Sequence, residues 1–337
     1  MLIGTAAAVV VMAGLRAAAG ILIPLVVASL LALIMLPIVT WLRARGIPAG
    51  LAVVGSMLVA LLGLAGPATI IAAAARRFVE RAPDYRAALG HQSAAMSAWL
   101  ESHGIPAIST VADPSILLDW TTAAAAGTAT LLSRVFLVLL ITAFILLEAA
   151  DFRPKLQTAF GMTESDVARL VTGTQQVYQF LWIKTLISAA TGILAGLWTA
   201  ALGIEFALLW GLAAFFLNYI PNVGSLIAAG PPVLLALLDG GVGRAAVVAV
   251  GYVALNLSLG SVLEPRLIGR RLGLSPLALL VSLMFWGWAW GPVGLLLSVP
   301  LTMSVKLLLE NFDRASWLAV LISRAPDASG DKRAPRS

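Results

Sequence analysis

The sequence predicts an all-α integral membrane protein, a multi-pass helical bundle with two broken or re-entrant helical hairpins. Of the 337 residues, 60% are hydrophobic and only 11% are charged, against roughly 25% charged in an average soluble protein. Several charge-free runs reach the roughly 20 residues that a helix needs to cross a bilayer. A transmembrane barrel would instead show segments of about ten residues with alternating polarity, and the sequence has none.

Composition also excludes several classes of function. The net charge of +6 comes from basic residues that flank apolar runs, a pattern that orients membrane spans, so we predict no nucleic-acid partner. The chain has no cysteine, and its two histidines, His91 and His103, lie twelve positions apart, so neither a metal site nor a cofactor is expected. It also lacks a P-loop and an HExxH motif. We predict no catalytic residues and no enzyme activity; the expected partners are the lipid bilayer and a small-molecule or ion substrate.

Hydropathy divides the chain into six parts. In order they are N-terminal transmembrane helices (1–75), an amphipathic extramembrane segment (76–120), a transmembrane helix (121–149), a cytoplasmic amphipathic segment (150–184), a C-terminal transmembrane transport core (185–310) and a cytoplasmic tail (311–337). No basic residue precedes the first apolar stretch, so it reads as a retained span rather than a signal peptide.

The first two apolar stretches, residues 2–15 and 17–41, are separated only by Arg16. This spacing predicts a tight hairpin or one long bent helix with breaks at Pro24 and Pro37. With the hairpin included, counting membrane crossings from a cytoplasmic N-terminus brings the basic C-terminal tail back to the cytoplasm. We therefore expect both termini to be cytoplasmic, as the positive-inside bias favours.

The segment 76–120 mixes charges with spaced apolar residues. Tyr85, Leu89, Met96 and Leu100 are separated by four, seven and four positions, which places them on one face of a helix. This pattern predicts an amphipathic helix outside the membrane or at its interface.

A second amphipathic helix is predicted to lead directly into the span at 185–204. Thr163 and Asp166 stand near capping-box spacing, and apolar residues follow at helical intervals. Within the span, Gly192 and Gly196 form a GxxxG pattern, which favours close packing against another helix.

Two apolar runs, 206–238 and 272–305, are too long for one membrane crossing and too short for two. As straight helices, each would measure about 50 Å. Helix breakers near their middles predict hairpins or broken helices, which are tolerated at membrane depth only in a protein interior or along a cavity. The breakers are Asn218, Pro221, Asn222 and Gly224 in the first run and Gly287, Gly291, Pro292 and Gly294 in the second.

Polar residues concentrate at these breaks and along the span between them. An unsatisfied backbone group in lipid costs several kcal/mol, so the breaks are expected to meet each other or water. Interrupted helices facing one another are a recurrent plan for solute sites in secondary transporters. The candidates for a substrate path are Asn218, Pro221, Asn222, Gly224, Ser225, Asn256, Ser261 and Pro292. The alternatives are helix packing for the prolines and glycines, and hydrogen bonds back to their own helix for the serines.

Glu264 is the candidate residue for the coupling ion. An acidic residue inside a span is by default a candidate for proton or cation coupling. Glu264 stands directly before Pro265 and Arg266, where the span ends, so an interfacial ion pair is the open alternative.

The C-terminal third resembles the autoinducer-2 exporter family of bacterial membrane transporters. The resemblance rests on NYIPNVGSLIAAGPPVLLALL from Asn218 and on VLEPRLIGRRLGLSPLALLVSLMFWGWAWGPVGLLLSVPL from Val262. The family pattern carries onto Pro221, Gly224, Pro231, Pro232, Glu264, Pro265, Gly269, Gly273, Pro276, Gly291, Gly294 and Pro300. Ser261 departs from it, since many members have Asn at this position, which puts a shared substrate or coupling ion in doubt.

The resemblance implies a multi-pass inner-membrane permease that exports a small solute without ATP hydrolysis. Export of autoinducer-2 gave the family its name, and cation/proton antiport is attached to some members. Two alternatives therefore stay open: a sodium or lithium/proton antiporter, and a non-transporting scaffold whose polar segments, 76–120 and 150–184, recruit partners. The small-residue helix faces also make a homo-oligomer possible.

Overall fold

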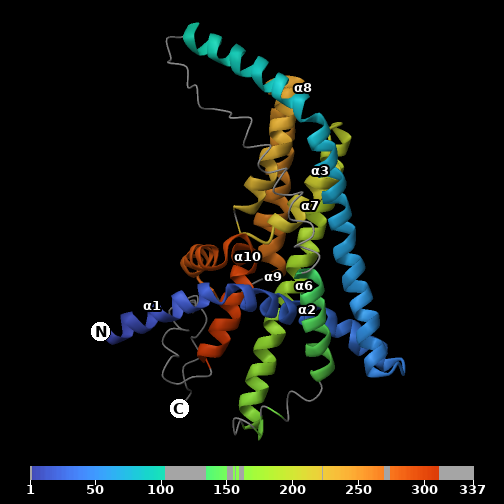
Figure 1. Cartoon of the computed structure of the whole chain (residues 1–337), viewed down its shortest axis with the longest axis vertical. Helices are drawn as coiled ribbons and strands as arrows, with labels where there is room; N and C mark the ends of the chain where they lie inside the picture. The colour runs from blue at the N-terminus through green and yellow to red at the C-terminus, as the bar shows by residue number, and fades with distance from the viewer. Residues whose placement is uncertain are drawn as a thin grey trace, which may run out of the picture. The chain divides into compact units, whose positions relative to one another are not determined.

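A computed structural model of the chain describes residues 2–102, 134–149, 155, 157–158, 163–221, 223–268 and 274–310. These residues are almost entirely helical (Figure 1), as the sequence predicts. The chain divides into two compact units. Unit 1 contains Met1–Ile23, Asp151–Ile183 and Arg266–Ser337, and unit 2 contains Pro24–Ala150 and Lys184–Pro265.

In chain order, the helices are α1 (Leu2–Ala17), α2 (Ala19–Ala44), α3 (Ala49–Ser102), α6 (Glu164–Ala201), α7 (Ala207–Leu217), α8 (Gly224–Leu255), the π-helix η1 (Asn256–Leu263), α9 (Glu264–Ile268) and α10 (Pro276–Glu310). Three helices, α2, α6 and α9, have residues in both units. Residues 134–148 are also helical. The expected C-terminal tail, 311–337, lies outside the described residues.

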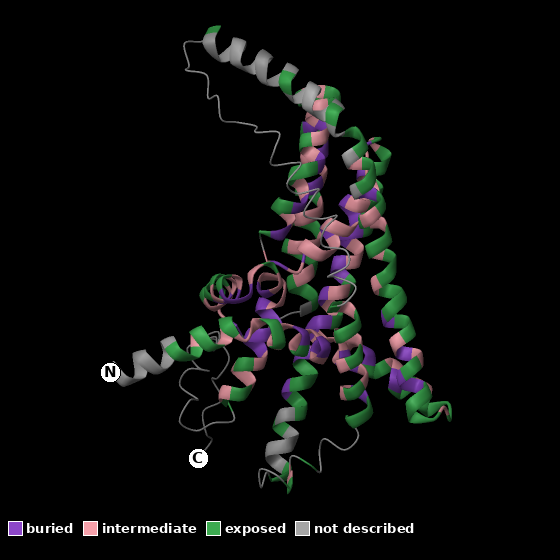
Figure 2. Ribbon diagram, in the orientation of Figure 1, coloured by how far each residue is buried: buried purple, intermediate pink, exposed green. Residues whose placement is uncertain are grey.

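The surface of these helices is apolar. Among the described residues, five helices are long and apolar enough to cross a membrane. Large hydrophobic side chains such as Leu62 on α3 and Leu226 on α8 are more than 70% exposed, and Figure 2 shows exposed residues along much of α3. Such a surface is stable against lipid rather than water, so the chain is a multi-pass membrane protein.

The N-terminal hairpin that the sequence allowed does not form. The amide of Ala18 donates to the carbonyl of Gly14, and the amide of Leu22 donates to that of Ala18, both at 2.9 Å, so helical bonding runs through the junction. Pro24 and Pro37 lie inside α2 without ending it. In apolar surroundings, losing one hydrogen bond at a proline costs less than exposing a whole helix end. Residues 2–44 thus form two successive helices, α1 and α2, that meet at Ala18, and the breaks expected at Pro24 and Pro37 are absent. The crossing count based on the hairpin loses its first step.

Helix α6 is continuous across the boundary that hydropathy suggested at residue 184. It begins at Glu164, directly after Thr163, as the capping pattern predicts. Gly192 and Gly196 on α6 pack against Gly211 on α7. A Cβ atom built on Gly192 would lie 2.7 Å from the carbonyl oxygen of Gly211, so the predicted close helix packing is confirmed.

We expect Gly192→Ala to destabilise the protein by about 1–3 kcal/mol, because the added methyl group forces two backbones apart. The thermal midpoint of the detergent-purified protein measures this effect. Gly66→Ala is the matched control, since nothing lies within 4 Å of a Cβ at Gly66. Equal midpoints for the two variants would contradict the close packing.

The first predicted hairpin forms in unit 2. Helix α7 has 11 residues, about 16 Å, so it is too short to cross a hydrocarbon core of about 30 Å. A tight turn joins it to α8, where Gly224 sits against the carbonyl of Leu217 with no room for a side chain. The break in the apolar run 206–238 is therefore confirmed as a hairpin.

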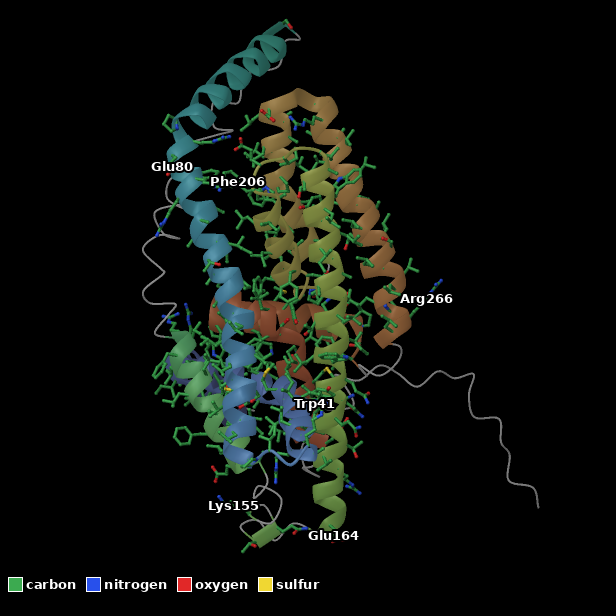
Figure 3. The ribbon with its side chains drawn as sticks, turned by 90° about the vertical axis from the view of Figure 1, so that its right-hand side faces the viewer. Trp41, Glu80, Lys155, Glu164, Phe206 and Arg266 are labelled. Atoms are coloured by element: carbon green, nitrogen blue, oxygen red, sulfur yellow. The ribbon has the colours of Figure 1, made fainter. Side chains whose placement is uncertain are left out.

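Helix α8 itself reverses at Gly241, whose backbone has φ 72° and ψ −170°. Figure 3 shows the two arms of α8 joined by this turn. Their facing residues, including Ala236, Ala245 and Val248, belong to one buried cluster. The second arm, continued by η1, is the span between the two long apolar runs.

Arg244 ties this turn to the turn between α6 and α7. Its guanidinium donates to the carboxylate of Asp239 at 2.5 Å and to the carbonyl oxygens of Leu202 and Gly203 at 2.7 and 3.2 Å. Hydrogen bonds from a charged guanidinium to a carboxylate and to carbonyl oxygens are stronger than neutral ones, so they hold the two turns together. The helices of unit 2 are thus joined at this end.

The second predicted hairpin forms in unit 1. Helix α10 reverses at Gly291, where φ is 64°. The hydroxyl of Ser282 donates to the carbonyl of Ser298 at 2.9 Å, and the indole N–H of Trp286 donates to Thr302 Oγ1 at 3.0 Å. These bonds join the two arms, so the break in the run 272–305 is also confirmed as a hairpin.

Candidate functional site

A pocket lies between the helices of unit 2. Its walls come from α6, α7, both arms of α8 and η1. The lining residues are Thr191, Ala195, Ala214, Asn218, Ser225, Ala228, Tyr252, Leu255, Asn256 and Gly260. Three of the predicted path residues, Asn218, Ser225 and Asn256, are thus brought together from three helical segments that are separated in the sequence.

The first hairpin positions Asn218 in this pocket. Asn218 follows α7 directly, and its backbone amide still donates to Ala214. Its side-chain amide donates to Ser188 Oγ on α6 at 3.0 Å. The hydroxyl of Thr191 donates to the carbonyl of Ile187 at 2.9 Å, which leaves its oxygen lone pairs as acceptors. These bonds hold two polar groups of the lining in fixed orientations.

Tyr252 adds a buried hydroxyl that has no partner. The residue is 6% exposed, and its Oη atom makes no hydrogen bond within the described part of the chain. Buried polar groups in proteins are nearly always hydrogen-bonded. An unpartnered hydroxyl on a pocket wall is therefore a group that a bound molecule can satisfy.

Among the described residues the lining has no charged side chain, and four of its members are alanine or glycine. The volume is about 340 Å³ when the open space at the mouth of the pocket is included. The pocket is narrow in this conformation, with room for about one water molecule. It offers neutral hydrogen-bonding groups between small apolar surfaces.

An ion pair lies one helical turn from the pocket. The ammonium of Lys184 on α6 is 2.6 Å from a carboxylate oxygen of Glu264 at the start of α9, and the two side chains are 3% and 21% exposed. Such a pair is strongly held once formed, because removing either charge leaves the other unpaired in a poorly hydrated place. Glu264 is thus ion-paired to a buried lysine.

The pocket and the ion pair share the same two segments. On α6, Lys184 lies one turn before Ser188, the partner of Asn218. On the other side, η1 places Asn256 in the pocket and ends where Glu264 begins. Single turns of π-helix are frequent at functional sites. A movement of η1 along α6 would therefore change the pocket and the ion pair together.

The other predicted path residues lie elsewhere. Pro221 and Gly224 belong to the tight turn below the pocket. Ser261 is exposed on η1, and Pro292 is exposed at the reversal of α10 in unit 1. Asn222 lies outside the described residues. Ser258 donates to the carbonyl of Ala254 at 2.7 Å, which is the back-bonding alternative considered for the serines.

Sequence reasoning missed Lys184 and Tyr252. Lys184 is the only charged residue between positions 170 and 204. It is the last residue of the predicted segment 150–184, so hydropathy assigned it to that segment and not to the span that follows. Tyr252 stands four residues before Asn256, so a helical projection of the span would have put the two on one face.

A second hollow in unit 2 is charged. It lies where α3 passes the turn between α6 and α7, and it is lined by Arg77, Glu80, Arg81, Glu205 and Phe206. Figure 3 labels Glu80 and Phe206 at this position. Arg81 and Glu205 form an ion pair across it, so opposite charges already balance one another there.

Comparisons with known proteins agree on one family. The AI-2 transport protein TqsA of Escherichia coli K12 is 36% identical over 94% of this chain and 93% of its own length. A transport protein of Haemophilus influenzae, whose name gives no substrate, is 34% identical over 97% of both chains. A sodium-lithium/proton antiporter of Halobacillus andaensis is 27% identical over 44% of this chain.

The profile described as AI-2E family transporter matches residues 5–314, nearly the whole chain. The full-length relatives named for transport agree with this match. The chain is a transporter that belongs to the AI-2E family.

Proposed function

We propose that the chain carries a small polar solute through the pocket of unit 2, without a catalytic step. The observation that supports this most is the convergence of Asn218, Ser225 and Asn256 on one cavity beside a helix break. Broken helices inside a membrane occur where they line a path or a binding site.

The first solute to test is autoinducer-2, because TqsA is named for its transport. Export across a bacterial inner membrane, with both termini in the cytoplasm, is the proposed setting. Everted vesicles from a host that lacks its own exporter should accumulate labelled autoinducer-2, and a proton uncoupler should abolish the accumulation. Inserted protein without accumulation would remove this substrate from the proposal.

We expect Ala228→Leu to reduce solute flux at least about tenfold, because the larger side chain fills a pocket that is already narrow. The measurement is the initial rate of accumulation in vesicles with equal amounts of inserted protein. Ala254→Leu is the matched control, since Ala254 is exposed on the neighbouring arm of α8. Equal fluxes in the two variants would show that solute does not pass through the pocket.

Glu264 is the proposed coupling residue, with Lys184 as its counter-charge. A proton entering this region has the Glu264 carboxylate as its acceptor, because the lysine ammonium has no free lone pair. Protonation would leave the 3% exposed ammonium without a counter-charge, which favours a rearrangement of η1 against α6. This arrangement links proton movement to the shape of the pocket.

Exchange of sodium or lithium against protons is the second candidate function. The buried Lys184–Glu264 pair and the named activity of the Halobacillus andaensis relative favour it. In energised everted vesicles, adding sodium or lithium chloride should then dissipate the pH gradient reported by a fluorescent dye. Potassium chloride is the control, and no response beyond that of potassium would exclude the exchange.

A further inference from the structure

We propose that the pocket of unit 2 selects neutral, hydroxyl-bearing solutes and that Tyr252 is its specificity-determining residue. This inference rests on the proposed solute path and names the class of substrate for it. It is carried by the unpartnered hydroxyl of Tyr252, by the absence of charge in the lining and by the small residues that flank the polar groups.

The hydroxyl of Tyr252 selects because it is unsatisfied in the empty pocket. A tyrosine hydroxyl both donates and accepts a hydrogen bond, and here neither capacity is used within the described residues. A solute hydroxyl can complete both. A solute of the same shape without a hydroxyl leaves the Tyr252 hydroxyl unsatisfied and its free-energy cost unrelieved. A site built to hydrogen-bond a solute hydroxyl rejects such an analogue more strongly than an apolar pocket can.

Other polar groups of the lining match the same chemistry. Asn218 uses one amide hydrogen toward Ser188 and keeps its amide oxygen as an acceptor. Thr191 offers oxygen lone pairs, and Ser225 and Asn256 add a hydroxyl and a second carboxamide. Since donors and acceptors are mixed around one cavity, a molecule with several hydroxyl groups can bond to more than one wall.

The lining disfavours an ionic solute. A charged group taken into a poorly hydrated cavity without an opposite charge is strongly unfavourable. Lys184 and Glu264, one helical turn from the lining, neutralise each other at 2.6 Å. A neutral solute does not require that pair to separate before it binds.

Small residues leave room for the carbon skeleton of the solute. Ala195, Ala214, Ala228 and Gly260 come from four different wall segments. Contact with small apolar side chains suits the C–H faces of a short polyol. Since the pocket holds about one water molecule in this conformation, the walls must separate for any larger solute to enter.

Tyr252→Phe tests the role of the hydroxyl without removing the ring. We expect this variant to have a thermal midpoint at or above that of the unchanged protein, because the change removes a buried, unpartnered polar group. Tyr178→Phe makes the same chemical change on α6 outside the pocket lining and serves as the control. A marked fall in the midpoint of Tyr252→Phe alone would show that the hydroxyl has a structural role.

The transport test uses the full chain reconstituted in liposomes and three labelled solutes: erythritol as a neutral polyol, succinate as an anion and sodium as a cation. Pocket-dependent flux is the difference between the unchanged protein and Ala228→Leu. We expect such flux for erythritol, and we expect Tyr252→Phe to reduce it about tenfold while Tyr178→Phe leaves it unchanged.

The outcomes separate the two proposals. Pocket-dependent flux of succinate or sodium, but not of erythritol, would overturn the neutral substrate class and keep the solute path. Erythritol flux that is equal in Tyr252→Phe and in the unchanged protein would overturn the role of Tyr252. Equal rates in the unchanged protein and Ala228→Leu for all three solutes would overturn the solute path, and the substrate class with it.

Discussion

Glu264→Gln is expected to destabilise the protein by about 3 kcal/mol or more, because it leaves the ammonium of Lys184 buried without a counter-charge. The thermal midpoint of the detergent-purified variant, followed by the fluorescence of the ten tryptophans, measures the loss. Lys184→Met is expected to cost less, because the carboxylate that it leaves is 21% exposed whereas the lysine is 3% exposed.

The double variant Lys184→Met with Glu264→Gln should recover most of the lost stability. No charge then remains unpaired, and replacing both members of a buried pair is often neutral or stabilising. Lys306→Met is the control, since Lys306 and Glu310 are 3.6 Å apart and Glu310 is half exposed, so this pair contributes less than about 1 kcal/mol. A double variant no more stable than Glu264→Gln would contradict the importance of the pair.

The same double variant should lose uphill transport completely. If Glu264 carries the coupling proton, its replacement by glutamine leaves a path without a proton acceptor, and solute can only equilibrate across the membrane. Accumulation in energised everted vesicles should therefore fall to equal concentrations on the two sides, although the protein is folded.

The double variant tests proton coupling in a folded protein. In Glu264→Gln alone, a loss of transport could come either from lost coupling or from lost stability. Facilitated entry of solute down its own gradient is the internal control, because it needs the pocket but not the proton. Uphill accumulation that persists in the double variant would exclude Glu264 as the coupling residue and would leave the ion pair with a structural role.

Much of the fold could be predicted because membrane-buried helices leave simple signals. Runs of 33 and 34 apolar residues with breakers near their middles predicted two hairpins, and the chain reverses at Gly291 and turns tightly at Gly224. The GxxxG pattern predicted close contact of α6, but its partner, Gly211, required the structure.

The N-terminal region shows why proline is a poor guide inside a membrane. In water, Pro24 and Pro37 would be reasonable places to end a helix. Inside lipid, the exposed backbone of a helix end has no solvent to bond with, so α2 continues through both prolines.

The site was harder to predict because it depends on contacts between distant segments. Polarity identified Asn218, Ser225 and Asn256, and they meet in one pocket. Lys184 stood 80 positions from its partner, and Ser261 lies exposed on the π-helix η1 rather than in the pocket. Neither distance nor helix type can be read from composition.

The hydrogen bonds of Arg244 fix one end of the helix pair formed by α6 and α8 in unit 2. Arg244 binds Asp239, beside the reversal of α8, and Leu202, directly after α6. The pocket residues of these two helices lie seven to sixteen positions away, about 10–24 Å along the axes. Helices tied at one end behave as levers, with an amplitude that grows with distance from the tie. A small rotation at Arg244 would therefore displace the pocket residues of α6 and α8 farther than the residues at the tie, and would widen the pocket without unfolding a helix.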